Sequence, residues 1–279
     1  MSDLWYQLKK NKIAMFGLFM TLVLMILAIA APIVAPYDPY KMAPEARLAG
    51  PSLAHLLGTD QFGRDILSRI IYGTRISLQV GIISVGLSLV LGTIIGVVAG
   101  YYGKWVDAAL SRLTDVMFAF PDILLALVIM AILGPSLTNL MIAVGIVYTP
   151  IFARIARGSV LANKNSLYIE AAKSMGVSNL KIMWKHILPN SMAPLIVQVT
   201  LSFAFAILAE AALSFLGLGV SPDTPSWGIM LSEGKDWMES AWWIAVFPGI
   251  AITLAVFSFN VMGDGLRDAL DPRLKNESA

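Results

Sequence analysis

The chain has no cysteine and few histidines or charged residues for its length. Its 279 residues include only two histidines, His55 and His186. A disulfide, a thiolate zinc site and thiol chemistry are therefore excluded, and we expect no metal site. Charged residues make up 14% of the chain and hydrophobic residues 57%, whereas soluble domains have roughly 25% and 45–50%. These deviations indicate an integral membrane protein that is in contact with lipid.

The chain also lacks the motifs of several functional classes. A net charge of +2 without a basic block gives no indication of nucleic-acid binding. The Gly-Lys pairs at 103–104 and 234–235 lack the upstream glycine and the following Ser or Thr of a phosphate-binding loop. No G-x-S-x-G or H-E-x-x-H motif occurs either. We therefore expect no catalytic residues, no enzymatic activity and no cofactor on this chain.

Uncharged runs predict membrane-spanning helices, because crossing the hydrocarbon core takes about 20 mostly apolar residues. The runs cover 13–37, 76–103, 123–153, 186–209 and 240–263. Gly134-Pro135-Ser136 divides the third run with a turn signal. Its first half would begin near Val116 and carry Pro121-Asp122 at its inner end, and its second half would run from about Leu137 to Ala153. The prediction is an all-α membrane protein with six transmembrane helices.

The basic residues predict the orientation of these spans. With a cytoplasmic N-terminus, most of the 20 Lys and Arg fall in inner segments, as in most membrane proteins. The predicted organisation is then a cytoplasmic N-terminus at 1–12, a first transmembrane helix at 13–36, an extracytoplasmic loop at 37–75, a five-helix core at 76–263 with an inner loop at 154–188, and a cytoplasmic C-terminus at 264–279.

Glycines recur on one face of the second predicted span. Gly92, Gly96 and Gly100 follow the i, i+4, i+8 pattern. Small residues at this spacing let two helix backbones approach closely in lipid. We therefore predict a helix-packing contact on this face, within the bundle.

The inner loop contains a short amphipathic helix followed by a bend. Asn165-Ser166 can cap its start, and Gly176 can end it. One helical face would carry Tyr168, Ala171, Ala172 and Met175, and the other would carry Glu170 and Lys173, a weakly favourable pair. Ser178-Asn179 can start a second helix, and Leu188-Pro189 can open the fifth span. A loop on the lipid headgroups and a segment that docks in a partner's groove both fit this pattern.

This segment resembles the EAA loop of permease subunits in bacterial ABC importers. The resemblance is carried by Glu170-Ala171-Ala172, Gly176 and Leu188-Pro189. Glu210-Ala211-Ala212 repeats the triplet, but Leu216 takes the place of the glycine and the segment lies in a span. In that family the loop docks into the ATP-hydrolysing subunit. The resemblance therefore implies a coupling helix with Leu188 and Pro189 as its lead-in, formed by Tyr168, Glu170, Ala171, Ala172, Lys173, Met175 and Gly176.

Other stretches extend the resemblance over nearly the whole chain. Residues 55–81, 217–231 and 263–274 are similar to segments of the dipeptide, oligopeptide and nickel permeases, and most similar to the dipeptide permease subunit that pairs with a second permease. The resemblance implies a type I ABC importer permease fold in the bacterial inner membrane. It also implies as partners a paralogous permease, two ATP-binding cassette subunits that hold ATP and magnesium, and an extracytoplasmic solute-binding protein.

Two alternatives remain for the function. A nickel or glutathione importer would use the same fold. An ion-gradient-driven secondary transporter would need carboxylates within the membrane, and the candidates are Glu210 and Asp122, both expected near span ends.

A charged turn precedes the second span, with Asp60, Arg64 and Asp65 around Gly63. Two carboxylates beside an arginine most often form a structural ion-paired turn. Contact with a solute-binding protein is the alternative.

Overall fold

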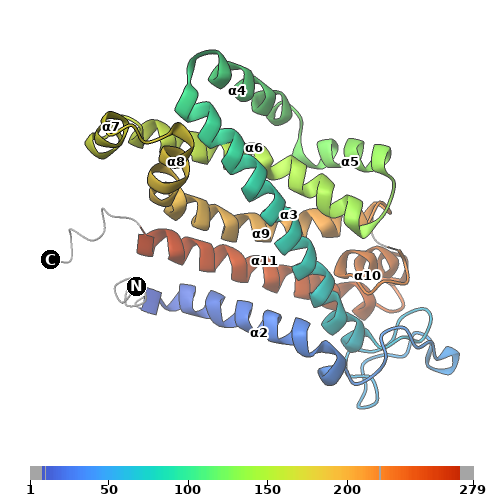
Figure 1. The fold of residues 1–279 in the computed structure, drawn as a ribbon. Helices are drawn as coiled ribbons and strands as arrows, with labels where there is room; N and C mark the ends of the chain where they lie inside the picture. The colour runs from blue at the N-terminus through green and yellow to red at the C-terminus, as the bar shows by residue number, and fades with distance from the viewer. Residues whose placement is uncertain (1–7, 10, 220, 271–279) are drawn as a thin grey trace.

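The computed structural model describes residues 8–9, 11–219 and 221–270. In these residues the chain is a bundle of long helices, with short helices gathered at its two ends (Figure 1). The predicted cytoplasmic termini at 1–12 and 264–279 lie largely outside the described residues.

Five helices are long and apolar enough to cross a membrane. They are α2 (Lys12–Val34), α3 (Ile66–Tyr102), α6 (Leu137–Asn163), α9 (Met192–Phe215) and α11 (Trp243–Leu270). A sixth candidate is the pair α4 (Lys104–Phe118) and α5 (Asp122–Leu133), which is bent by 94°. The chain is therefore an all-helical membrane protein with up to six spans.

The third predicted span is not one continuous helix. Pro121 precedes α5 and lacks the N–H that would continue the hydrogen bonds of α4. A proline also disfavours helical geometry in the residue before it, here Phe120. The prediction of a single helix with Pro121-Asp122 at its inner end was wrong, because these residues separate two helices of different direction.

Helices α3, α6, α9 and α11 extend beyond the uncharged runs that predicted them, α3 and α6 the furthest. Helix α3 begins at Ile66, where the carboxylate of Asp65 accepts the backbone N–H of Ser68 at 2.8 Å. Helix α6 continues past Ala153 to Asn163. Both ends lie in segments that the charge pattern assigned to loops, because charged side chains end a membrane-embedded stretch without ending a helix.

Helices α3 and α6 form the most extensive helix–helix contact among the described residues. Cβ atoms added at Gly92 and Gly100 would lie 2.5 Å and 2.8 Å from the Cβ atoms of Phe152 and Val160, and one added at Gly96 would meet the carbonyl oxygen of Ala153. Only glycine permits this approach. The glycine face of α3 therefore contacts α6 within the chain.

Two hydroxyl groups add polar contacts between the same helices. Ser84 and Ser88 of α3 donate hydrogen bonds to the carbonyl oxygens of Met141 and Gly145 of α6, at 3.0 Å and 2.7 Å. Such bonds join helices in an environment without water.

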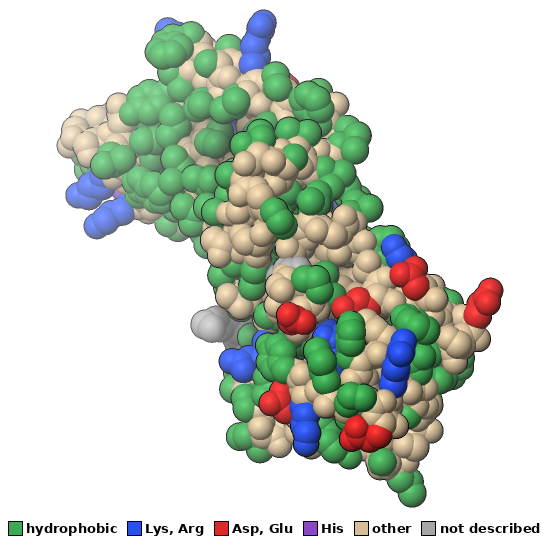
Figure 2. All heavy atoms as spheres, turned by 90° about the vertical axis from the view of Figure 1, so that its right-hand side faces the viewer, with side chains coloured by type: hydrophobic (Ala, Val, Ile, Leu, Met, Phe, Trp, Pro, Cys, Tyr) green, Lys and Arg blue, Asp and Glu red, His purple; other side chains and the backbone are tan. Residues whose placement is uncertain are grey.

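The short helices lie at opposite ends of the bundle. Helices α7 (Leu167–Ser174) and α8 (Asn179–Ile182) form one end, and α10 (Trp227–Gly234) lies with the 37–65 loop at the other end (Figure 1). Viewed from the α10 side, acidic and basic side chains gather in the lower part of the molecule, whereas the upper part is mostly apolar (Figure 2).

Candidate functional site

The bend of the inner loop is a left-handed glycine turn. Gly176 has a φ of 72°, and its N–H donates to the carbonyl oxygen of Lys173 at 2.9 Å. The N–H of Val177 donates to the carbonyl oxygen of Ala172 at 3.1 Å. These two bonds form a Schellman motif, which satisfies carbonyls at the end of α7. The turn thereby fixes the direction in which the chain leaves this helix.

One face of α7 packs into the main core of the protein. Ile169 and Ala172 are buried, and they belong to the same apolar cluster as Val160 of α6 and Ile187. The prediction that Ala172 shares an exposed face with Ala171 was wrong. Ala171 is exposed, whereas Ala172 lies three residues from Ile169 and faces inward with it.

Polar contacts also attach the inner loop to the end of α3. The hydroxyl of Tyr101 donates to the side-chain oxygen of Asn179 at 2.7 Å, and the Lys173 ammonium lies 5.7 Å from the centre of the Tyr101 ring. Lys173 therefore contacts α3 and forms no ion pair with Glu170 among the described residues, contrary to the prediction. The loop is held as a rigid extension of the bundle.

The expected side-chain cap of α7 is absent. Ser166 occupies the N-cap position, but its hydroxyl donates to the carbonyl oxygen of Asn163 at 2.7 Å and accepts no N–H of α7. Its hydroxyl thus holds the end of α6.

The opposite face of the loop is apolar and exposed. Leu167 is 83% exposed, Met175 76% and Leu180 63%. Tyr168 is 42% exposed and Trp184 is 47% exposed. Large apolar side chains exposed close together along one short segment are typical of a protein interface. We call Leu167, Tyr168, Met175, Leu180 and Trp184 the loop surface.

A continuous helical path leads from the loop surface into α9. After α8, residues Met183–Ile187 form a π-helical turn, in which the N–H of Leu188 donates to the carbonyl oxygen of Met183 at 2.9 Å. Pro189–Ser191 form a 3₁₀ turn that runs into α9. Pro189 stands in the first turn, where no N–H is needed. A displacement of α7 and α8 would thus reach the membrane helix through ordered backbone.

Comparisons with known proteins identify the family. Residues 92–276 match the family described as binding-protein-dependent transport system inner membrane component, and residues 1–51 match the N-terminal transmembrane domain of oligopeptide transport permease C. The chain belongs to this family of inner-membrane transport components. It is a multi-pass inner-membrane permease, as the resemblance of the inner loop implied.

Curated relatives of the permease cover almost all of its length. The dipeptide transport system permease protein of Alkalihalophilus pseudofirmus is 52% identical over 97% of this chain and 89% of its own. The dipeptide permease of Escherichia coli is 48% identical over 99% and 94%. The glutathione transport system permease protein of Pectobacterium atrosepticum is 45% identical over 98% and 91%.

A solved structure supports the fold. The inward-facing structure of the MetNI methionine ABC transporter matches with a TM-score of 0.60 and 17% identity, over 74% of this chain and 98% of that chain. The permease therefore has the type I ABC importer permease fold.

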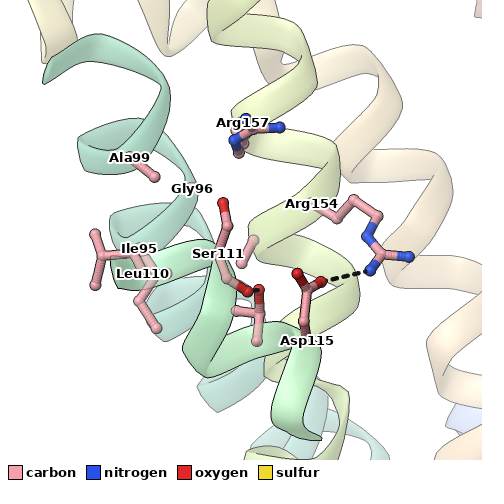
Figure 3. A pocket seen from close by; sticks show the side chains of 10 residues that line it. Ile95, Gly96, Ala99, Leu110, Ser111, Asp115, Arg154 and Arg157 are labelled. Atoms are coloured by element: carbon pink, nitrogen blue, oxygen red, sulfur yellow. Dashed lines mark hydrogen bonds and ion pairs between the residues drawn. The ribbon is translucent and has the colours of Figure 1, made fainter. Parts of the chain in front are cut away.

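A polar pocket lies between α3, α4 and α6 (Figure 3). Its volume is about 220 Å³. Arg157 of α6 holds Asp107 of α4 with two hydrogen bonds of 2.5 Å and 2.7 Å, and Arg154 contacts Asp115 at 3.2 Å. These pairs fix α4 against α6. Sequence analysis missed them, because the partners are 39 and 50 residues apart.

The charged turn of the outer loop is buried within the permease. Asp60 accepts hydrogen bonds from Arg64 Nε at 2.5 Å and from the backbone N–H of Phe62 and Arg64. Asp65 caps α3 and accepts from His55 at 2.9 Å. Asp60, Arg64 and Asp65 are at most 3% exposed. The prediction of a structural ion-paired turn is therefore confirmed, and the alternative, contact with a binding protein, is disfavoured because these side chains are buried.

Helix α10 completes this outer cluster. Arg64 donates to Glu233 of α10 at 3.1 Å, and Arg69 of α3 lies 3.8 Å from the same carboxylate. Burial raises the pKa of Glu233, and the attraction of Arg64 and Arg69 offsets part of this rise. The cluster joins the outer loop, α3 and α10 into one unit.

Glu210 is fully buried near the C-terminal end of α9. Its carboxyl oxygen Oε1 accepts hydrogen bonds from Ser214 at 2.9 Å and from Ser226 at 2.6 Å. Ser226 is the N-cap of α10. Glu210 therefore connects α9 to α10 and does not extend toward the lipid–water boundary.

Proposed function

We propose that the chain is the permease subunit of an ATP-driven peptide importer of the bacterial inner membrane. It would form half of the translocation pathway with a paralogous permease, and a solute-binding protein would deliver peptide from outside. Two separate ATP-binding subunits would hydrolyse ATP, so that this chain catalyses no reaction. The observation that carries the proposal is the loop surface. It is apolar and exposed, while Ile169 and Ala172 of the same helix are buried in the main apolar cluster.

The loop surface is suited to receive a mechanical input. Leu167, Met175 and Leu180 would insert into a groove of the ATP-binding subunit, while Ile169 and Ala172 transmit its movement to the core. The Schellman turn at Gly176 keeps α7 and α8 in a fixed relation, and the path through Pro189 continues into α9. Such an arrangement can bias a two-state membrane domain from a distant site.

Peptide is the substrate class that the relatives support best. Two of the relatives described above are named for dipeptide transport. Glutathione is the second candidate, on the strength of the 45% identical glutathione permease. With the loop surface in the cytoplasm, both termini would also be cytoplasmic.

Site-directed crosslinking tests the proposal. The chain has no cysteine of its own, so Met175→Cys can carry a single benzophenone maleimide in native membranes. We expect it to attach to a protein with a phosphate-binding loop, identified by mass spectrometry. The buried Ala172→Cys is the matched control and should give little adduct.

Two outcomes would contradict the proposal. One is an equal adduct from both positions or none from Met175→Cys. The other is labelling of Met175→Cys by a membrane-impermeant maleimide added outside intact cells, because the loop surface would then face the wrong side.

A further inference from the structure

The break between α4 and α5 lies a full helix length away from the turn that joins α5 to α6. At 1.5 Å per residue, Asp122 lies about 16 Å along α5 from its outer end at Leu133. This is roughly half of a hydrocarbon core about 30 Å thick. Tyr148 of α6 lies at a similar distance from Leu137 and lines the same small cavity as Asp122.

The surroundings of Asp122 are apolar, and they come from three helices. The cavity is lined by Asp122, Ile123 and Ala126 of α5, by Val144, Val147 and Tyr148 of α6, and by Ala209 and Leu213 of α9. The Tyr148 hydroxyl donates to the carbonyl oxygen of Phe205 at 3.3 Å. Among the described residues, no Lys or Arg forms an ion pair with Asp122, whose side chain is exposed on this chain.

Contact of this surface with lipid would be unfavourable for two separate reasons. A carboxylate at mid-depth faces a water-filled path or a partner in membrane proteins. Interrupted helical backbone at this depth is tolerated only where it is covered by protein or lines an aqueous cavity. Both features point to an aqueous path on this side of α5, α6 and α9.

We propose that Asp122 lines the translocation pathway and binds the α-ammonium group of the passing peptide. The ammonium group is common to peptides of every side-chain composition, so that one carboxylate among apolar residues would act on all of them. The site rests on the proposed function and defines its substrate class as peptides with a free amino terminus. Asp122 is then a specificity-determining residue of the pathway.

Uptake of a radiolabelled dipeptide into vesicles containing the complete importer tests this role. Asp122→Asn should lower uptake by about tenfold to a hundredfold, the loss expected for one charge-assisted hydrogen bond. Asp122→Glu should retain most of the uptake. Wild-type vesicles that import no dipeptide would refute the proposed function itself, whereas normal uptake by Asp122→Asn beside an active wild type would refute only the role of Asp122.

A chemical rescue separates charge from structure. Asp122→Cys can be modified with methanethiosulfonates of similar size that add either an ethylsulfonate or an ethylammonium group, because the chain has no other cysteine. The sulfonate should restore uptake relative to the unmodified variant, and the ammonium should not. Asp268→Cys, at the exposed cytoplasmic end of α11, is the control and should respond to neither reagent. Equal effects of the two reagents at position 122, or no labelling there, would overturn the proposal.

Discussion

Gly176 allows the proposed coupling to be tested by adding a single methyl group. Its φ is 72°, and no heavy atom lies within 4 Å of the place where a Cβ would stand. A substitution therefore meets no steric obstacle and changes only the backbone preference. The left-handed conformation costs a non-glycine residue about 1–2 kcal/mol, less for asparagine and more for a β-branched side chain. The bend should weaken in the order Asn, Ala, Val.

The assay is the ratio of peptide imported to ATP hydrolysed in vesicles that contain the complete importer. A loss of 1–2 kcal/mol reduces the population of the native bend by roughly five- to thirtyfold relative to alternatives. Gly176→Val should hydrolyse ATP with little import, Gly176→Ala should be intermediate, and Gly176→Asn should approach the wild type. Gly158→Ala in α6 is the matched control, since its added Cβ also meets no atom and its φ is not positive. Normal coupling in Gly176→Val, or equal defects in all three variants, would refute the reasoning.

Two further predictions concern stability. Gly96→Ala should lower the free energy of unfolding by about 1–3 kcal/mol, because its Cβ would lie 2.7 Å from that of Ala156. Gly86→Ala is the control, since its Cβ meets no atom. An equal loss of thermal stability in both variants would contradict the prediction. Because the folded-state pKa of Glu233 is raised above 4.5, its ionisation opposes folding. The unfolding temperature should therefore fall as the pH rises from 4.5 through the raised pKa of Glu233. Glu233→Gln should flatten this dependence of the unfolding temperature on pH. The same slope in the wild type and in Glu233→Gln would contradict the prediction.

Five of the six predicted spans are long helices in the structure, and they could be predicted because their signal is local. Each uncharged run is long enough to cross the membrane, and the glycine spacing of α3 identifies a close-packing face before its partner is known. Gly176 is equally local, since the end of a short helix requires a left-handed residue. These features depend on neighbouring residues alone.

The inward and outward faces of α7 could not be predicted in the same way. Helical spacing groups Tyr168 with Ala171 and Ala172 with Ile169, but it does not show which group faces the core. The burial of Ile169 in the cluster that also holds Val160 decides this, and that cluster depends on where α6 ends. The outer ion pairs are also non-local, since Glu233 is 169 residues from Arg64.

The broken span shows why a proline alone does not predict a break. Pro32, Pro150 and Pro248 all lie inside continuous helices, although each lacks the same N–H as Pro121. The difference is that α4 is held in another direction by α6, through Arg157–Asp107 and Arg154–Asp115. The angle between α4 and α5 is 94°, so the proline marks the place where the chain can turn, and the contacts of α4 with α6 favour the new direction. The depth of Asp122, and with it the proposed peptide site, therefore depends on contacts that span 39 and 50 residues of sequence.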